Sequence, residues 1–178
     1  MRYLSLLLLV TILFRPVIGE TSRDTLIVGK PAPFFFTKSL DGVDFFLSRK
    51  VGARALPKDR TPVVLSFFTT TCLPCREEIP CLQKLRDEFP TVSYYLINVN
   101  EDPPVVARYI AKMGFTLPVL TDRFGYIAKR YQANNTPTLV IIKSDGNVSY
   151  YKQGFKSSDT ALIRAALLKV LPAPGTGK

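Results

Sequence analysis

The chain has 178 residues, of which 47% are hydrophobic and 21% are charged, and its formal net charge is +10. This length and apolar fraction suit one domain with its own hydrophobic core and argue against a disordered chain. Nucleic acid is not a predicted partner, because no basic helix with interleaved aromatic residues occurs. We interpret the one denser basic group as a solvated loop; its members are Arg49, Lys50, Arg54, Lys58 and Arg60.

Residues 1–19 have the composition of a secretory signal peptide. Arg2 precedes an apolar run over residues 4–14, and we expect cleavage after Gly19. The alternative is an uncleaved membrane anchor, although the run is short for a membrane span and Arg15 interrupts its far end. Either outcome places the domain in an oxidising compartment, periplasmic or otherwise extracytoplasmic.

The remaining chain is predicted to be a flexible lead at residues 20–30, one domain at residues 31–171 and a disordered tail at residues 172–178. The domain opens with a β-hairpin whose turn lies near Asp41-Gly42. The later elements are a strand at 63–68, a helix from about 75 to 89, a strand at 92–99, a helix at 103–113, an extended segment at 117–120, a short helix at 124–131, strands at 138–143 and 148–152, and a helix at 161–171. This order predicts an α/β fold, a mixed sheet with helices on both faces.

Cys72 and Cys75 lie where the apolar strand at residues 63–68 gives way to a helix. The unpaired N–H groups and the positive dipole end of that helix favour a thiolate. We expect Cys72 to be the attacking thiolate, with Cys75 close enough to form a disulfide with it. A zinc site would need two more ligands, and the chain has no histidine and only one other cysteine, so a redox pair is preferred.

With strand, cysteine pair, helix and late hairpin in this order, the chain resembles the thioredoxin superfamily and, within it, the TlpA/ResA-type thiol-disulfide oxidoreductases. The resemblance covers about residues 28–171 and implies a thioredoxin fold with an N-terminal β-hairpin extension. The matching motifs are residues 67–80 (FFTTTCLPCREEIP), 29–34 (GKPAPF), Asp41-Gly42, 118–122 (PVLTD), 136–138 (TPT) and Asp145-Gly146. The family usually has tryptophan before the first cysteine; Thr71 stands there instead, and this weakens the apolar shield over the thiol.

The resemblance also implies the substrate-binding residues. Pro137 matches a cis proline that packs opposite the cysteine pair in such folds, and an X-Pro bond held cis usually has a structural purpose. The backbone beside it, at Thr136, is expected to pair with an extended segment of the substrate. Leu73 and Pro74, between the two cysteines, complete the predicted substrate-binding set.

Glu78 is the third predicted catalytic residue, after the two cysteines. It lies three residues after Cys75, so both side chains share one side of the helix. The resemblance implies that a glutamate here tunes the protonation of the cysteine pair, and a desolvated carboxylate can relay a proton to or from Cys75. The alternative is a solvated helix glutamate.

Cys81 lies six residues after Cys75, which is roughly 240° around a helix. It is therefore not expected to bridge Cys75. We interpret it as a partly exposed free thiol; an intermolecular disulfide or a third redox thiol is the alternative.

The predicted reaction is dithiol–disulfide exchange with partner proteins, and no metal or organic cofactor is implied. The Leu73-Pro74 pair resembles reducing family members, and no histidine separates the cysteines, so we predict a protein-disulfide reductase. The resemblance implies a membrane electron donor and a role such as cytochrome c maturation. A peroxiredoxin-type thiol peroxidase, a Cu(I) carrier on the same fold and an inert scaffold with a permanent disulfide are the alternatives.

Overall fold

The computed structural model describes residues 28–171. The predicted signal or anchor at residues 1–19 and the predicted tail at residues 172–178 lie outside the described residues. Of the predicted flexible lead, residues 28–30 are described, and they form a turn in which the Gly29 N–H donates to the Val148 carbonyl at 2.7 Å. No helix between residues 28 and 171 is long and apolar enough to cross a membrane.

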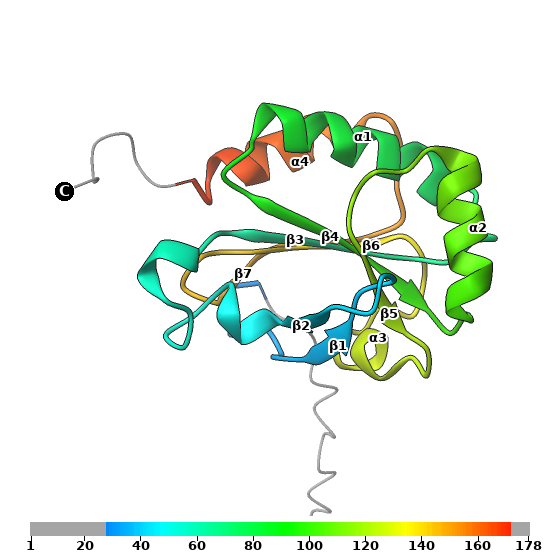
Figure 1. The fold of residues 1–178 in the computed structure, drawn as a ribbon. Coiled ribbons are helices and arrows are strands. Elements are labelled where there is room, and N and C mark those ends of the chain that lie inside the picture. The colour runs from blue at the N-terminus through cyan, green and yellow to red at the C-terminus, as the bar shows by residue number, and fades with distance from the viewer. Residues whose placement is uncertain (1–27, 172–178) are drawn as a thin grey trace, which may run out of the picture.

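A five-stranded mixed sheet forms the centre of the fold (Figure 1). Its strands, in spatial order, are β5 (Val119–Asp122), β4 (Ser93–Val99), β3 (Val63–Phe68), β6 (Thr138–Ile142) and β7 (Val148–Gln153). Strands β3, β4 and β5 run parallel, whereas β6 runs antiparallel to both of its neighbours. All six side chains of β3 are buried, which explains why its sequence is a nearly continuous apolar run. The predicted mixed sheet is confirmed.

Two hydrophobic layers cover the two faces of the sheet (Figure 1). The first layer comes from α1 (Cys75–Glu88), α2 (Pro103–Met113) and α4 (Asp159–Leu168). The second layer comes from the antiparallel hairpin of β1 (Phe36–Lys38) and β2 (Asp44–Phe46), the short helix η1 (Leu47–Arg49), and α3 (Tyr126–Arg130). A further short helix, η2, spans Pro57–Asp59. The predicted hairpin and the helices on both faces are therefore confirmed.

Most element boundaries agree with the sequence-based expectation. The bounds of α2 agree because Pro103 opens its first turn and Gly114, at φ +66°, ends it in a left-handed conformation that glycine adopts without strain. Three elements differ by two or more residues. Strand β5 spans Val119–Asp122 rather than residues 117–120, because its polar end still pairs with β4. Helix α3 spans Tyr126–Arg130 rather than residues 124–131. Helix α4 ends at Leu168 rather than residue 171 and begins at Asp159, whose carboxylate accepts the Lys156 N–H at 2.8 Å.

Candidate active site

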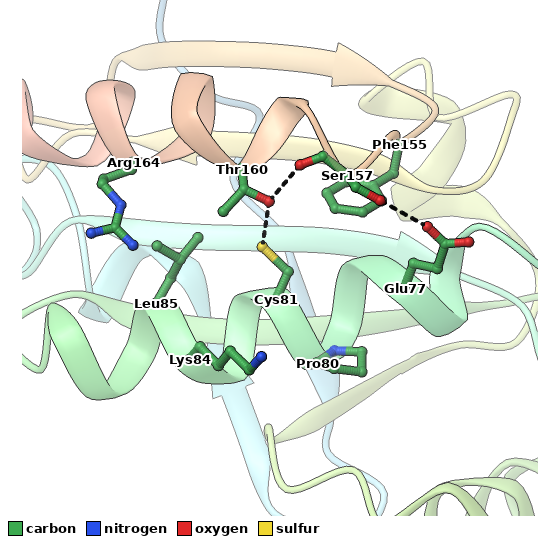
Figure 2. A pocket seen from close by; sticks show the side chains of 9 residues that line it. All are labelled: Glu77, Pro80, Cys81, Lys84, Leu85, Phe155, Ser157, Thr160 and Arg164. Atoms are coloured by element: carbon green, nitrogen blue, oxygen red, sulfur yellow. Dashed lines mark hydrogen bonds between the residues drawn. The ribbon is translucent and has the colours of Figure 1, made fainter.

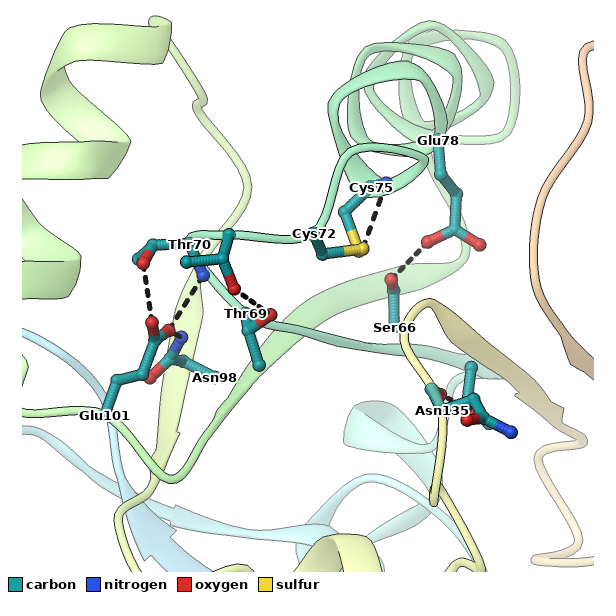
Figure 3. Close-up of a disulfide and its surroundings, with 11 residues drawn as sticks. Ser66, Thr69, Thr70, Cys72, Cys75, Glu78, Asn98, Glu101 and Asn135 are labelled. Atoms are coloured by element: carbon teal, nitrogen blue, oxygen red, sulfur yellow. Dashed lines mark hydrogen bonds between the residues drawn. A yellow bond between two sulfur atoms is a disulfide. The ribbon is translucent and has the colours of Figure 1, made fainter.

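The connection from β3 to α1 carries a disulfide between Cys72 and Cys75 (Figure 3). The Cα atoms of the two cysteines are 5.4 Å apart. Pro74 lies immediately before α1 with helical backbone angles, as a proline at a helix start should. The predicted pairing of the two cysteines is therefore present in the structure.

The two cysteines differ in exposure and in hydrogen bonding. The residue Cys72 is 7% exposed, whereas Cys75 is completely buried. The Cys75 N–H, at the first turn of α1, donates to Cys72 Sγ at 3.2 Å. A partner molecule therefore reaches Cys72 first, and a thiolate formed there keeps a hydrogen-bond donor at the positive end of the helix dipole.

Glu78 is buried on α1, with only 1% of its surface exposed. Its Oε2 atom accepts a hydrogen bond of 2.5 Å from the hydroxyl of Ser66 in β3 (Figure 3). Burial raises the pKa of Glu78 to about 7, the Ser66 hydrogen bond opposes this, and the negative charge of Asp159 adds to it. Glu78 is thus not a solvated helix glutamate, in contrast to the exposed Glu77.

The Thr136–Pro137 peptide bond is cis, as expected. The strand that follows, β6, pairs Thr138 with Phe67 of β3, so the proline loop lies beside the end of the strand that leads to the disulfide. The Pro137 carbonyl accepts the Gly154 N–H at 2.7 Å. Within residues 28–171 neither backbone group of Thr136 has a hydrogen-bond partner in the protein.

The surface around the disulfide includes one exposed apolar side chain and one cavity. Leu73, between the cysteines, is 67% exposed. The cavity has a volume of about 400 Å³ and lies at the carboxyl ends of β3 and β4; Thr69, Asn100, Lys129, Asn134 and Thr136 are among its lining residues. The lining of this cavity therefore includes Thr69, three residues before Cys72, and Thr136 of the proline loop, but not Cys72 itself.

Two polar residues of the site were missed by the sequence analysis. Ser66 lies within the strand predicted as apolar, and Glu101 lies between the strand predicted to end at residue 99 and the helix predicted to begin at residue 103. Glu101 accepts hydrogen bonds from the segment before Cys72 (Figure 3). Each had a signal: Ser66 is the one polar residue in its run, and Glu101 follows the carboxyl end of β4, which is on the same side of the sheet as the cysteine pair.

Cys81 is half-buried on α1 and forms no disulfide with another described cysteine, so the expected partial exposure is confirmed. Its Sγ lies 3.3 Å from Thr160 Oγ1 of α4 (Figure 2). The groove between the two helices has a volume of about 310 Å³, and Glu77, Pro80, Lys84, Phe155 and Arg164 are among the other residues that line it. No three histidine, cysteine, aspartate or glutamate side chains gather as a metal site within the described part of the chain.

Comparison with known proteins identifies the family. The family model described as "AhpC/TSA family" matches residues 28–151. The chain belongs to this family. Within it, the chain is 28% identical to the thiol-disulfide oxidoreductase ResA of Geobacillus thermodenitrificans (strain NG80-2), with 83% of each chain covered. It is 27% identical to the sporulation thiol-disulfide oxidoreductase A of Bacillus subtilis (strain 168), over 67% of this chain and 70% of the relative.

A solved structure gives the same result for this AhpC/TSA-family chain. The thiol:disulfide interchange protein of the thioredoxin family from Chlorobium tepidum TLS superposes with a TM-score of 0.65 at 26% identity, over 82% of this chain and 99% of that one. The thioredoxin fold and the resemblance to ResA-type proteins are confirmed. With the Cys72–Cys75 pair in place, the chain is a thiol-disulfide oxidoreductase, as predicted.

Proposed function

We propose that this oxidoreductase works outside the cytoplasm and reduces disulfides of partner proteins. The observation that supports the proposal most is the asymmetry of the cysteine pair: Cys72 retains 7% exposure and its sulfur accepts a helix N–H, whereas Cys75 is fully buried. The reductive direction rests on the Leu73-Pro74 dipeptide and on the absence of histidine between the cysteines.

The reaction has two exchange steps. The Cys72 thiolate attacks one sulfur of the partner disulfide, a mixed disulfide forms, and the other partner sulfur leaves as a thiolate. The Cys75 thiolate then attacks Cys72 Sγ, the mixed disulfide breaks, and the second partner sulfur leaves. The partner gains two electrons, and the enzyme ends as the Cys72–Cys75 disulfide seen in the structure.

We propose that Glu78 accepts the proton that Cys75 must lose in the second step. Cys75 is completely buried and must lose its proton before it attacks. Glu78 lies on the same helix side, is held by Ser66, and has a pKa of about 7, so near neutral pH it exists in both protonation states. A carboxylate with this pKa accepts the Cys75 proton and releases it again in the next cycle.

We assign substrate binding to Leu73, Pro74, Thr136 and Pro137. The free backbone N–H and carbonyl of Thr136 suit an added strand of the partner, and the exposed Leu73 side chain suits an apolar contact with it. The substrate is therefore expected to be an extended segment around its disulfide rather than a folded surface.

The sequence and the resemblance support a proposal for the partners and the location. We propose that residues 1–19 act as a signal peptide, or else as an anchor, that a membrane protein supplies the electrons, and that the substrates are proteins such as apocytochromes c. Expression of the full chain with a C-terminal tag, followed by cell fractionation and mass measurement, tests the location. Cytoplasmic recovery of a chain that retains residues 1–19 would contradict it.

The activity test uses the fully reduced full-length chain and a disulfide-bonded Cys-X-X-Cys-His peptide. We expect the peptide to be reduced in proportion to the enzyme, and the Cys72→Ser variant to be inactive. Consumption of hydrogen peroxide in place of the peptide disulfide would favour the thiol peroxidase. A Cys72–Cys75 disulfide that a mild dithiol fails to open would favour the inert scaffold.

A further inference from the structure

The carboxylate of Glu101 accepts three hydrogen bonds, two from Thr70 in the connection after β3 and one from Asn98 in β4 (Figure 3). The N–H of Thr70 donates to Oε2 at 2.8 Å, and the Thr70 hydroxyl donates to Oε1 at 2.5 Å. The side-chain amide of the buried Asn98, in β4, donates to Oε2 at 2.5 Å. One side chain therefore ties the segment after β3 to the end of β4.

This tether lies close to the attacking sulfur along the chain. Thr70 precedes Cys72 by two residues, in a connection that belongs to neither β3 nor α1. On the other side of Cys72, the Cys75 N–H donates to its sulfur. The Cys72 N–H itself bonds to the Thr69 carbonyl, at 3.2 Å, within the same connection. Glu101 is thus the link that joins the chain just before Cys72 to the rigid sheet.

The effect of this tether on the position of Cys72 depends on the redox state of the cysteine pair. In the oxidised protein the disulfide itself fixes Cys72 next to Cys75. Reduction removes this covalent link, and the hydrogen bonds of Thr70 to Glu101 then limit how far Cys72 can move from Cys75. A tether that acts in the dithiol state raises the effective concentration of one thiol at the other, which favours and accelerates ring closure.

We propose that Glu101 is a positioning residue that holds Cys72 near Cys75 in the reduced protein and thereby stabilises the active-site disulfide. The proposal rests on dithiol–disulfide exchange at Cys72 and Cys75. Glu101 acts through Thr70 and takes no part in proton or electron transfer. Its loss shifts the thiol–disulfide equilibrium toward the dithiol and slows the attack of Cys75 on a mixed disulfide at Cys72.

Three variants separate this role from simple stabilisation and from charge. Glu101→Gln removes the charge and replaces one acceptor oxygen by a donor. Thr70→Val removes the hydroxyl donor and keeps the charge. Asp102→Asn is the matched control, because Asp102 is the neighbouring exposed carboxylate in the same loop and pairs with Arg123, at 2.8 Å, rather than with Thr70.

The measurement is the equilibrium constant for the Cys72–Cys75 disulfide in full-length protein against a dithiothreitol redox buffer. After acid quenching and alkylation, tryptic peptide 61–76 contains both cysteines and excludes Cys81, so mass spectrometry reads the pair alone. The same alkylation and mass measurement gives the closure rate, which is the rate at which Cys75 displaces glutathione from a mixed disulfide at Cys72. Urea unfolding of the oxidised variants supplies their stability.

We expect the equilibrium constant for the Cys72–Cys75 disulfide to fall about tenfold in Glu101→Gln, which for a two-electron couple raises the reduction potential by about 30 mV. Thr70→Val is expected to shift in the same direction by a smaller factor, with slower closure in both variants, while Asp102→Asn stays within about twofold of the native protein. If Glu101→Gln does not fold, the disulfide constant and the closure rate of Thr70→Val alone decide whether the proposal holds.

Two results overturn the proposal. Native constants and closure rates in Glu101→Gln and Thr70→Val, with only a lower urea midpoint, would make Glu101 a structural residue. An equal shift in Asp102→Asn would make the effect one of charge. Failure of the native protein to exchange with dithiothreitol at all would instead refute the proposed exchange activity, so the two failures are distinguishable.

Discussion

Ser66 and Glu78 meet inside the protein: the hydroxyl on β3 donates to the carboxylate on α1 at 2.5 Å, and Glu78 is 1% exposed. A buried carboxylic acid with one hydrogen-bond donor is held closer to its neutral form than a solvated one, and the pKa of Glu78 rises to about 7. We therefore expect both the stability and the activity of the protein to depend on pH near neutrality.

The first prediction concerns stability in Glu78→Gln. Because the folded pKa lies above the unfolded value of 4.5, the stability contributed by the neutral acid is fully present below pH 4.5 and lost as the pH rises through 7. We expect urea unfolding of the oxidised protein to show that, between pH 4.5 and 8, the free energy of unfolding falls by about 3 kcal/mol more in the native chain than in Glu78→Gln. Glu77→Gln, on the exposed side of α1, is the control. If the free energies of unfolding of the native protein and of Glu78→Gln change in parallel with pH, Glu78 is not a buried acid with a raised pKa.

The second prediction concerns turnover in the same variant. Glutamine cannot take the Cys75 proton, so the rate of peptide-disulfide reduction at pH 7 is expected to fall at least about tenfold. The rate profile is also expected to lose its inflection near pH 7, while Glu77→Gln keeps it. A Glu78→Gln profile with the native inflection would assign that inflection to another group.

The third prediction separates the two cysteines. Cys75→Ser is expected to accumulate a mixed disulfide with the peptide substrate at Cys72, detected by mass spectrometry without reductant, because the resolving thiol is missing. Cys72→Ser, combined with Cys81→Ser, is expected to form no such adduct, since Cys75 is then the one cysteine left and is completely buried. Cys81→Ser serves as the control and should turn over at the native rate. An adduct on Cys75 in Cys72→Ser would reverse the assignment of the attacking sulfur.

The fourth prediction concerns substrate contact at Leu73. Its side chain is 67% exposed, so Leu73→Ala is expected to leave the free energy of unfolding unchanged. Loss of apolar contact with the partner is expected to raise KM for a protein substrate by about fivefold with kcat maintained. Leu162→Ala is the matched control, since Leu162 is 57% exposed on α4. Equal KM values for both variants would remove Leu73 from the substrate-binding surface.

The fold was predictable wherever local sequence decided the structure. The strand at residues 63–68 is marked by its apolar run, and α2 is bounded by Pro103 and by the left-handed Gly114. The far end of β5 was missed because Thr121 and Asp122 are polar and are held in the sheet by backbone pairing with β4. Such pairing depends on a partner strand distant in sequence, which periodicity does not report.

The candidate site was predictable only in part for the same reason. The cysteine pair and Pro137 lie in a recognisable local pattern, whereas the partners of Glu78 and Thr70 do not. Ser66 faces Glu78 across the boundary of strand and helix, and Glu101 reaches Thr70 from 31 residues further along the chain. The Ser66–Glu78 contact depends on how α1 packs on β3, and the Glu101–Thr70 contact depends on the pairing of β4 with β3, and neither is visible in the local sequence.

The central claim is that this thiol-disulfide oxidoreductase is a reductase. The most direct test is the reduction potential of the Cys72–Cys75 pair, with Cys81→Ser so that no third thiol takes part. We predict a value near or below about −270 mV, at which the dithiol is a strong reductant that needs an electron supply. A value above about −180 mV would make the protein an oxidant or isomerase and would contradict the proposed direction.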